Sequence, residues 1–172
     1  MLKKFLVLTF LLFLPQTFLY AELPYYLDFR FILNESNAGK KAQKSLKSEL
    51  ENGMKALSDR EKSIQKEEKD IINQKKVISA EEYKKKVISL RSKVSTLQKD
   101  RKALITRVSK KRSKAKSELL KNLNPIIKDY MKEKKIRYVM DKKSLILADE
   151  NLDITQDIIN ILNDKLKTIK LN

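Results

Sequence analysis

Apolar residues recur at helical spacing through most of the middle of this 172-residue chain. They return every seven residues from Leu50 to Ile78, and they alternate at intervals of four and three from Tyr83 onward. This heptad pattern is typical of helices that pack against each other along a narrow seam. It predicts two long helices, whose seam residues are Leu50, Leu57, Ile64, Ile71 and Ile78 on the first and Tyr83, Leu90, Leu97 and Leu104 on the second.

A short stretch between the two patterns contains a helix start. The sequence Ser79-Ala80-Glu81-Glu82 has the form of a capping box, in which a serine side chain accepts a hydrogen bond from the third helical amide. Folding the chain back between residues 80 and 81 brings the two seams into register over about five heptads. We therefore predict an antiparallel helical hairpin with its tip near residues 79–83. The facing pairs are Ile78 with Tyr83, Ile71 with Leu90, Ile64 with Leu97, Leu57 with Leu104, and Leu46 with Ala115.

The hairpin is expected to form an arm over residues 40–119, on the order of 50 Å long at 1.5 Å per helical residue. Its first helix has few apolar residues in the middle, and Gly53 costs about 1 kcal/mol relative to alanine in a helix. Such an arm should bend and splay more readily than a well-packed coiled coil. The charged residues that occupy the alternate seam positions are Arg60, Glu61, Glu67, Glu68 and, on the second helix, Arg101.

The two flanks predict a small body made of residues 22–39 and 120–172. Residues 23–29 alternate in the manner of a strand, and residues 136–148 indicate two short strands around a turn near 141–144. Pro125 should kink or restart the second helix of the arm. A final helix should follow, with Asp153 or Thr155 as its N-cap. Its expected buried stripe is Ile158, Ile159, Leu162 and Leu166.

Together these elements predict an α+β fold dominated by helix, in which a small β-containing body carries a long antiparallel helical-hairpin (coiled-coil) arm. The predicted sheet edges have no covering element, and exposed edges favour pairing with another chain. We therefore expect the body to mediate self-association.

The first 21 residues have the pattern of a signal peptide. Two lysines precede the ten-residue apolar run FLVLTFLLFL, and a small residue, Ala21, marks the expected cleavage site. The alternative is an uncleaved anchor, but residues 5–21 are short for a membrane span and contain Pro15. We expect an exported protein that is cleaved after Ala21.

The composition argues against most enzyme chemistry. The chain has no His, Cys or Trp and only two Gly, so it lacks an imidazole base, a thiol nucleophile and a Gly-rich phosphate loop. We expect no catalytic, cofactor-binding or metal-binding residues, and no cofactor. Residues 40–134 hold 29 Lys and Arg against 13 Asp and Glu, a net charge of +16 within a chain of +17. For an exported protein, this charge suggests anionic lipid, lipopolysaccharide or acidic polypeptides as partners rather than nucleic acid. A merely solvated charged face is the alternative.

The order of motifs along the mature chain resembles the Skp/OmpH family of periplasmic chaperones. The matching stretches are YLDFRFILNESNAGK, VMDKKSLILA and LDITQDIINIL, with the charged hairpin between them. The resemblance implies a homotrimer with a small β-containing body and three helical arms around a cavity. It also implies an ATP-independent holdase for unfolded outer-membrane proteins. Pro125 and the Lys-rich arms depart from the family pattern, which leaves the arm–body angle and the client range open.

Some apolar residues fall outside the seam and are candidate contacts for an unfolded client. The alternative is that they broaden the seam within the hairpin. Two other functions also remain open: an exported polyanion or membrane-surface binder, acting on lipopolysaccharide or anionic lipid through the basic arm, and a coiled-coil spacer. The candidate client contacts are Ile72, Val77, Ile88 and Ile105.

Overall fold

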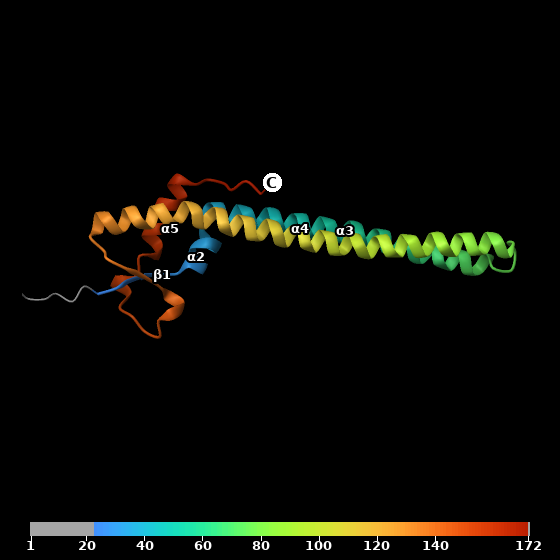
Figure 1. The fold of residues 1–172 in the computed structure, drawn as a ribbon, viewed down its shortest axis with the longest axis horizontal. Helices are drawn as coiled ribbons and strands as arrows, with labels where there is room; N and C mark the ends of the chain where they lie inside the picture. Colours follow the sequence, from blue (N-terminus) through green and yellow to red (C-terminus); the bar gives the residue numbers. More distant parts are fainter. Residues whose placement is uncertain (1–22, 172) are drawn as a thin grey trace, which may run out of the picture.

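A long two-helix arm projects from a small body in the computed structural model, which describes residues 23–171 (Figure 1). The predicted signal peptide, residues 1–21, lies outside the described residues. The predicted fold class, a helix-dominated α+β protein with a long antiparallel hairpin, is confirmed. Within the described part of the chain, every helix is too short or too polar to cross a bilayer.

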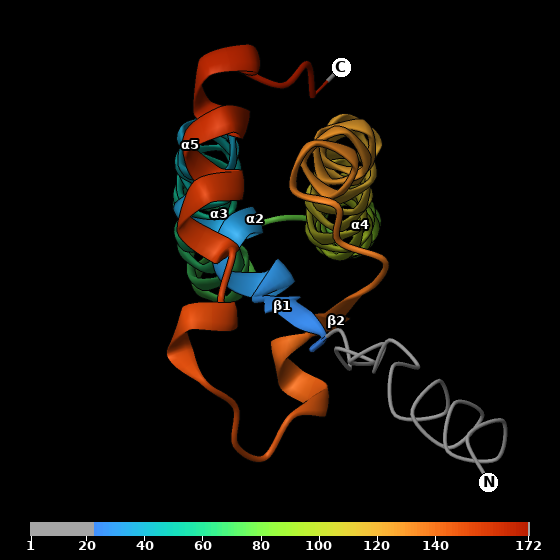
Figure 2. The same ribbon diagram turned by 90° about the vertical axis from the view of Figure 1, so that its left-hand side faces the viewer.

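Two helices make up the arm. Helix α3 covers Asn37–Gln74 and helix α4 covers Ala80–Lys134, and they lie antiparallel and side by side (Figures 1 and 2). The connection between them spans residues 75–79, slightly before the tip expected at 79–83. Ser79 is the last residue of this connection and the N-cap of α4. The Glu82 amide donates a 3.1 Å hydrogen bond to the Ser79 hydroxyl, so the serine caps the helix as predicted.

The arm is joined to the body by a second capped break. The short helix α2, Phe29–Glu35, ends at Ser36, and the buried Ser36 hydroxyl accepts a 3.2 Å hydrogen bond from the Gly39 amide to begin α3. A Cβ on Gly39 would lie only 2.0 Å from the Leu33 carbonyl oxygen. Only glycine allows α2 and α3 to meet this closely.

The body contains one small parallel sheet. Strand β1, Tyr25–Leu27, pairs with strand β2, Val139–Asp141, so that Tyr25 lies opposite Val139. The strand predicted over residues 23–29 is therefore shorter than expected. It ends at Asp28 because that carboxylate accepts a 2.8 Å hydrogen bond from the Phe31 amide and thereby starts α2.

The second strand predicted within residues 136–148 is absent from the described structure, and this part of the prediction is wrong. After β2 the chain forms a 3-10 turn, Lys142–Ser144, then an extended loop and a second 3-10 turn, Glu150–Leu152. Ile146 and Leu147 in the loop are almost fully exposed. A strand needs a neighbouring edge to satisfy its backbone groups, and the sheet of the described residues pairs β1 with β2 and not with this segment.

Helix α4 passes through Pro125 without interruption, so the predicted restart there is wrong. A proline in a helix interior costs about 3 kcal/mol through a lost hydrogen bond and a clash. Leu123, Ile126 and Ile127, which flank Pro125, are all buried in the body core, and this burial offsets the cost.

The final helix, α5, covers Thr155–Lys165 and buries the predicted residues Ile158, Ile159 and Leu162. Its N-cap is Ile154, not Asp153 or Thr155 as predicted, and Ile154 makes no side-chain cap. The Asp153 carboxylate nevertheless accepts a 2.9 Å hydrogen bond from the Thr155 amide.

The body core joins segments from the two ends of the chain. Its fully buried side chains come from β1, α2, α4 and α5, and the Asp28 amide donates a 2.9 Å hydrogen bond to the Thr155 hydroxyl. Because both ends of the arm enter this core, the body holds the base of the hairpin. The largest buried apolar side chains are Leu27, Ile32, Leu123, Ile158 and Leu162.

Candidate functional site

The predicted seam residues lie on α3 and α4 except Ile78, which was predicted on the first helix and lies in the connection after it, because α3 ends at Gln74. Leu57, Ile71, Leu97 and Leu104 are buried, and the remaining five are half-buried. Leu57, Leu97 and Leu104 form an apolar cluster separate from the body core, which Val108 and Leu46 extend toward the body. The half-buried seam residues are Leu50, Ile64, Ile78, Tyr83 and Leu90.

Ion pairs connect the two helices where the seam has few apolar residues. Arg60 lies 2.6 Å from Asp100, Glu61 lies 3.0 Å from Arg101, and Glu67 lies 2.6 Å from Lys93. The sequence reasoning treated Arg60, Glu61, Glu67 and Arg101 as interruptions of the seam. The predicted hairpin register could have identified these ion pairs, because it places the two residues of each pair opposite each other to within one position.

Glu49 forms a two-cation junction near the base of the arm. Its carboxylate accepts hydrogen bonds from Arg107 at 2.9 Å and Lys111 at 2.8 Å. The bonds from Lys111 and then Arg107 hold the pKa of Glu49 below its usual value. This junction joins α3 to α4 between the seam and the body.

The four candidate client contacts lie on the outer surface of the arm. The exposed fractions are 58% for Ile72, 80% for Val77, 57% for Ile88 and 55% for Ile105. More than half of each side chain therefore lies in solvent, where a second molecule can reach it. These aliphatic groups lie on a largely charged and polar surface, on which Met54 and Val94 are also exposed.

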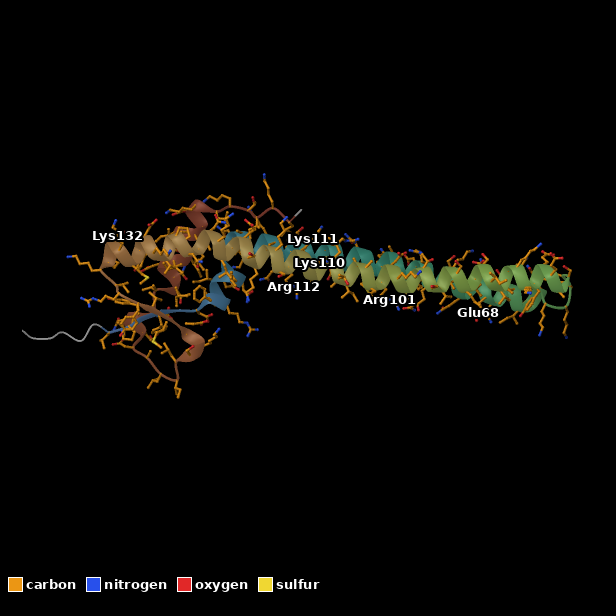
Figure 3. The ribbon with its side chains drawn as sticks, in the orientation of Figure 1. Glu68, Arg101, Lys110, Lys111, Arg112 and Lys132 are labelled. Atoms are coloured by element: carbon orange, nitrogen blue, oxygen red, sulfur yellow. The ribbon has the colours of Figure 1, made fainter. Side chains whose placement is uncertain are left out.

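A basic groove of about 670 Å³ runs along α4. Leu171 from the C-terminal tail closes one side of it and also packs against the seam cluster, while Ile169 of the same tail packs against the body core. Figure 3 labels Lys110, Lys111 and Arg112, which lie in the half of the arm that is nearer to the body. Sequence reasoning missed the tail, because two apolar residues after a helix carry no periodic signal. The helix residues that line the groove are Lys99, Lys102, Ala103, Thr106, Arg107, Lys110, Lys111 and Lys114.

Two polar contacts secure the body beneath the arm. The Tyr130 hydroxyl donates a 2.5 Å hydrogen bond to Asp157, and burial together with this carboxylate raises the pKa of Tyr130 to about 12. Burial raises the pKa of Asp153, but hydrogen bonds from Thr155 and Lys142 outweigh it and hold this pKa below its usual value. These contacts tie α4 to α5, and the 3-10 turn at Lys142 to the residues that precede α5.

Comparison with protein families covers most of the chain. The model of the family described as outer membrane protein (OmpH-like) matches residues 25–162, from β1 into α5. The chain belongs to the OmpH-like family. The matched range includes both helices of the arm, so the family pattern extends over the body and the hairpin alike.

Individual relatives are distant in sequence. An uncharacterised protein of Aquifex aeolicus is 25% identical over 136 residues, which cover 79% of this chain and 83% of that protein. A crystal structure from Caulobacter crescentus, described as a candidate OmpH-like outer membrane chaperone, superposes with a TM-score of 0.80 at 21% identity. It covers 86% of this chain and 89% of the other. At this identity the likeness shows the fold that OmpH-like proteins share.

Proposed function

We propose that the chain is an ATP-independent holdase chaperone that acts in the periplasm and keeps unfolded outer-membrane proteins from aggregating. Membership of the OmpH-like family supports a chaperone role. The observation that carries the proposal is the set of exposed aliphatic side chains on a strongly basic arm, namely Ile72, Val77, Ile88 and Ile105.

The chemistry of an unfolded barrel protein suits this surface. Such a chain exposes strands with alternating apolar residues and unpaired backbone groups, and it aggregates unless its copies are kept apart. Each exposed isoleucine offers roughly 1–2 kcal/mol if a client buries it, so several weak contacts add up without demanding one sequence. The excess of lysine attracts acidic segments at long range and keeps the complex soluble.

We further propose that three copies assemble through the body, so that their arms surround one client. The support is an exposed apolar segment in the loop that follows β2: Ile146 and Leu147 are 104% and 92% exposed, and β2 is at the edge of a sheet of two strands. A neighbouring copy that pairs with this segment would cover both residues and satisfy the backbone groups of the loop. The export that this role requires is supported by the signal-peptide pattern of residues 1–21.

The function is tested by diluting an unfolded outer-membrane barrel protein from urea with and without residues 22–172, while light scattering is recorded. We expect the chain to suppress scattering. Changing Ile72, Val77, Ile88 and Ile105 together to Ser should weaken the suppression, while circular dichroism shows unchanged helix content. Loss of helix would instead show that these residues support the hairpin.

The rival function, binding of a polyanion or membrane surface, predicts that the unmodified chain does not suppress scattering. The same assay also separates charge from apolar contact in the recognition of a client. If charge alone carries recognition, the Ser variant keeps full activity and added salt releases the client from the unmodified chain, because salt screens exposed charges. Absence of any suppression by the unmodified chain would refute the holdase proposal.

A further inference from the structure

The tail that follows α5, residues 166–171, lies against the arm as an extended strap. Helix α5 ends at Lys165, and the amide of its C-cap, Leu166, donates a 2.8 Å hydrogen bond to the Leu162 carbonyl. From there the tail turns from the side of α3 toward α4 (Figure 2). Leu171 is half-buried, packs against the seam cluster and lines the groove along α4. The tail therefore occupies part of that groove.

Apolar side chains hold the tail in place. Ile169 and Leu171 are half-buried, whereas Lys170 between them is exposed, so successive side chains point to opposite faces as in a strand. Among the described residues, the backbone of residues 167–171 makes no hydrogen bond to the arm. Release of Leu171 therefore breaks an apolar contact and no backbone pairing with the arm.

The charge of the tail opposes its place in the groove. Six cations line the groove, and among the described residues only Glu49 neutralises any of them, through Arg107 and Lys111. The tail brings a further lysine, Lys170, directly before Leu171. Like charges repel across a Debye length of about 8 Å at physiological salt. The contact of Leu171 is thus apolar and favourable, while the lysine beside it makes the tail easy to displace.

An unfolded client strand has the feature that seats the tail. In the strands of a membrane barrel, apolar residues alternate with polar ones, which is the spacing of Ile169 and Leu171. The groove also adjoins the proposed client surface, because Ile105 lies between Ala103 and Thr106, which line the groove. Such a strand need not place a lysine beside its apolar side chains. It can therefore take the place of Leu171 at a lower electrostatic cost.

We propose that the tail is a built-in competitor of the client. Leu171 occupies the groove along α4 while the chain is empty, and an apolar client strand displaces it. The tail thereby shields the groove and the adjoining seam cluster between clients. This inference rests on the proposed holdase function and adds to it a regulation of the client surface.

A single thiol can report the position of the tail, because the chain has no cysteine. Residues 22–172 carrying Leu171→Cys are treated with a maleimide, with and without a cysteine-free unfolded barrel protein, and mass spectrometry follows the labelling. We expect the client to raise the labelling rate by about threefold, as it shifts the tail from docked to free. The matched control Thr168→Cys, at an exposed position of the same tail, should be labelled at one rate throughout. Unchanged or slower labelling at position 171 would overturn the proposal.

Removal of the competing side chain should strengthen client binding. Leu171→Ser should lower the apparent Kd for the unfolded barrel protein by about threefold, because a docked tail reduces the fraction of chains that are open to the client. The control Thr168→Ser changes the same tail and should leave the Kd as it is. Circular dichroism checks that both variants keep the helix content of the unmodified chain. An unchanged Kd for Leu171→Ser would show that the tail does not cover the client site, and a higher Kd would make Leu171 a client contact. Either result would refute the competition.

Failure of this inference is distinguishable from failure of the holdase function. If the unmodified chain suppresses scattering but the labelling at position 171 ignores the client, the competition by the tail is refuted alone. If the chain suppresses no scattering, the holdase function is refuted and the competition with it.

Discussion

Gly53 allows the two helices of the arm to approach each other closely. A Cβ at this position would lie 2.6 and 2.7 Å from the two terminal carbons of Leu104. Leu104 is buried in the seam, so its side chain occupies the space that a larger residue at position 53 would need. The sequence indicated only the helix-propensity cost of this glycine, whereas the packing gives it a structural role.

Gly53→Ala should lower the free energy of unfolding by about 1 kcal/mol, because overpacking costs about 1–3 kcal/mol and the propensity gain returns about 1 kcal/mol. Urea unfolding followed by circular dichroism measures the change. In a chain that already carries Leu104→Ala, a Cβ at position 53 no longer meets the Leu104 side chain. Gly53→Ala should then raise the free energy of unfolding. A stabilising effect in the unmodified chain would show that Leu104 moves aside without cost.

The junction at Glu49 predicts a dependence of stability on pH. Its pKa is lower in the folded chain than the ordinary value of 4.5, because Lys111 and Arg107 favour the charged form. The stabilisation is therefore present above pH 4.5 and is lost as the pH falls through the lowered pKa. Glu49→Gln should melt below the unmodified chain at pH 7, and the difference should shrink below pH 4.5. Glu51→Gln, a control on an exposed neighbour, should show little effect at any pH. If the difference in melting temperature between the two chains persisted undiminished at pH 2, the charged form of Glu49 would not be its cause.

At the scale of elements, two kinds of contact set the register of α3 against α4. The apolar seam alone is narrow, and a helix pair with one narrow seam can slide by a heptad. The ion pairs Arg60–Asp100, Glu61–Arg101 and Glu67–Lys93 lie in the middle of the arm, where the seam has few apolar residues. A slide would separate all three pairs at once. Individually, exposed pairs contribute little to stability, so their main effect is on register.

Engineered disulfides can measure this register, since the chain contains no cysteine. Ile64→Cys/Leu97→Cys should oxidise to a bond within one chain, because both residues lie in the same seam cluster. Gel mobility without reductant and mass spectrometry detect the bond. The control Ser63→Cys/Leu97→Cys places one cysteine on an exposed position and should oxidise poorly. If a disulfide formed efficiently only between positions one helical turn away, the register of α3 against α4 would differ from the predicted one.

At the scale of the whole molecule, the proposed function assigns assembly and client contact to different parts of the chain. The arm satisfies its own seam, whereas the body exposes Ile146 and Leu147 in the loop that follows β2. The apolar groups that a second copy would cover thus lie in the body. Those that a client would cover lie on the arm.

Deleting residues 50–111 should therefore leave a short-armed trimer by analytical ultracentrifugation. The deletion joins Glu49 to Arg112, which face each other across the hairpin in the predicted register, and it removes no residue of the body core. In the full chain, Ile146→Asp/Leu147→Asp should instead give monomers, because buried carboxylates would oppose the interface. A monomer from the deletion, or a trimer from the Asp variant, would show that the interface lies elsewhere.

The sequence by itself determined the hairpin, because the helical repeat is a local property that is visible in one segment at a time. Leu57, Ile71, Leu97 and Leu104 are buried as the heptad pattern requires, and Ile72 and Ile105, which fall outside it, are exposed. Ser79 starts α4 because its side chain needs only a partner three residues away. The candidate client contacts were predicted from the same heptad pattern, because they fall outside its seam positions.

Tertiary structure decided the features that depend on distant partners. The segment containing Ile146 and Leu147 has the composition of a strand but forms none in the protomer, because a strand requires an edge that sequence cannot supply. Pro125 remains within α4 because its neighbours Leu123 and Ile126 are buried against segments from both ends of the chain. Gly53 is useful only because Leu104 lies opposite. For Pro125 and Gly53, local preference was outweighed by packing energy that exists only once the chain has folded.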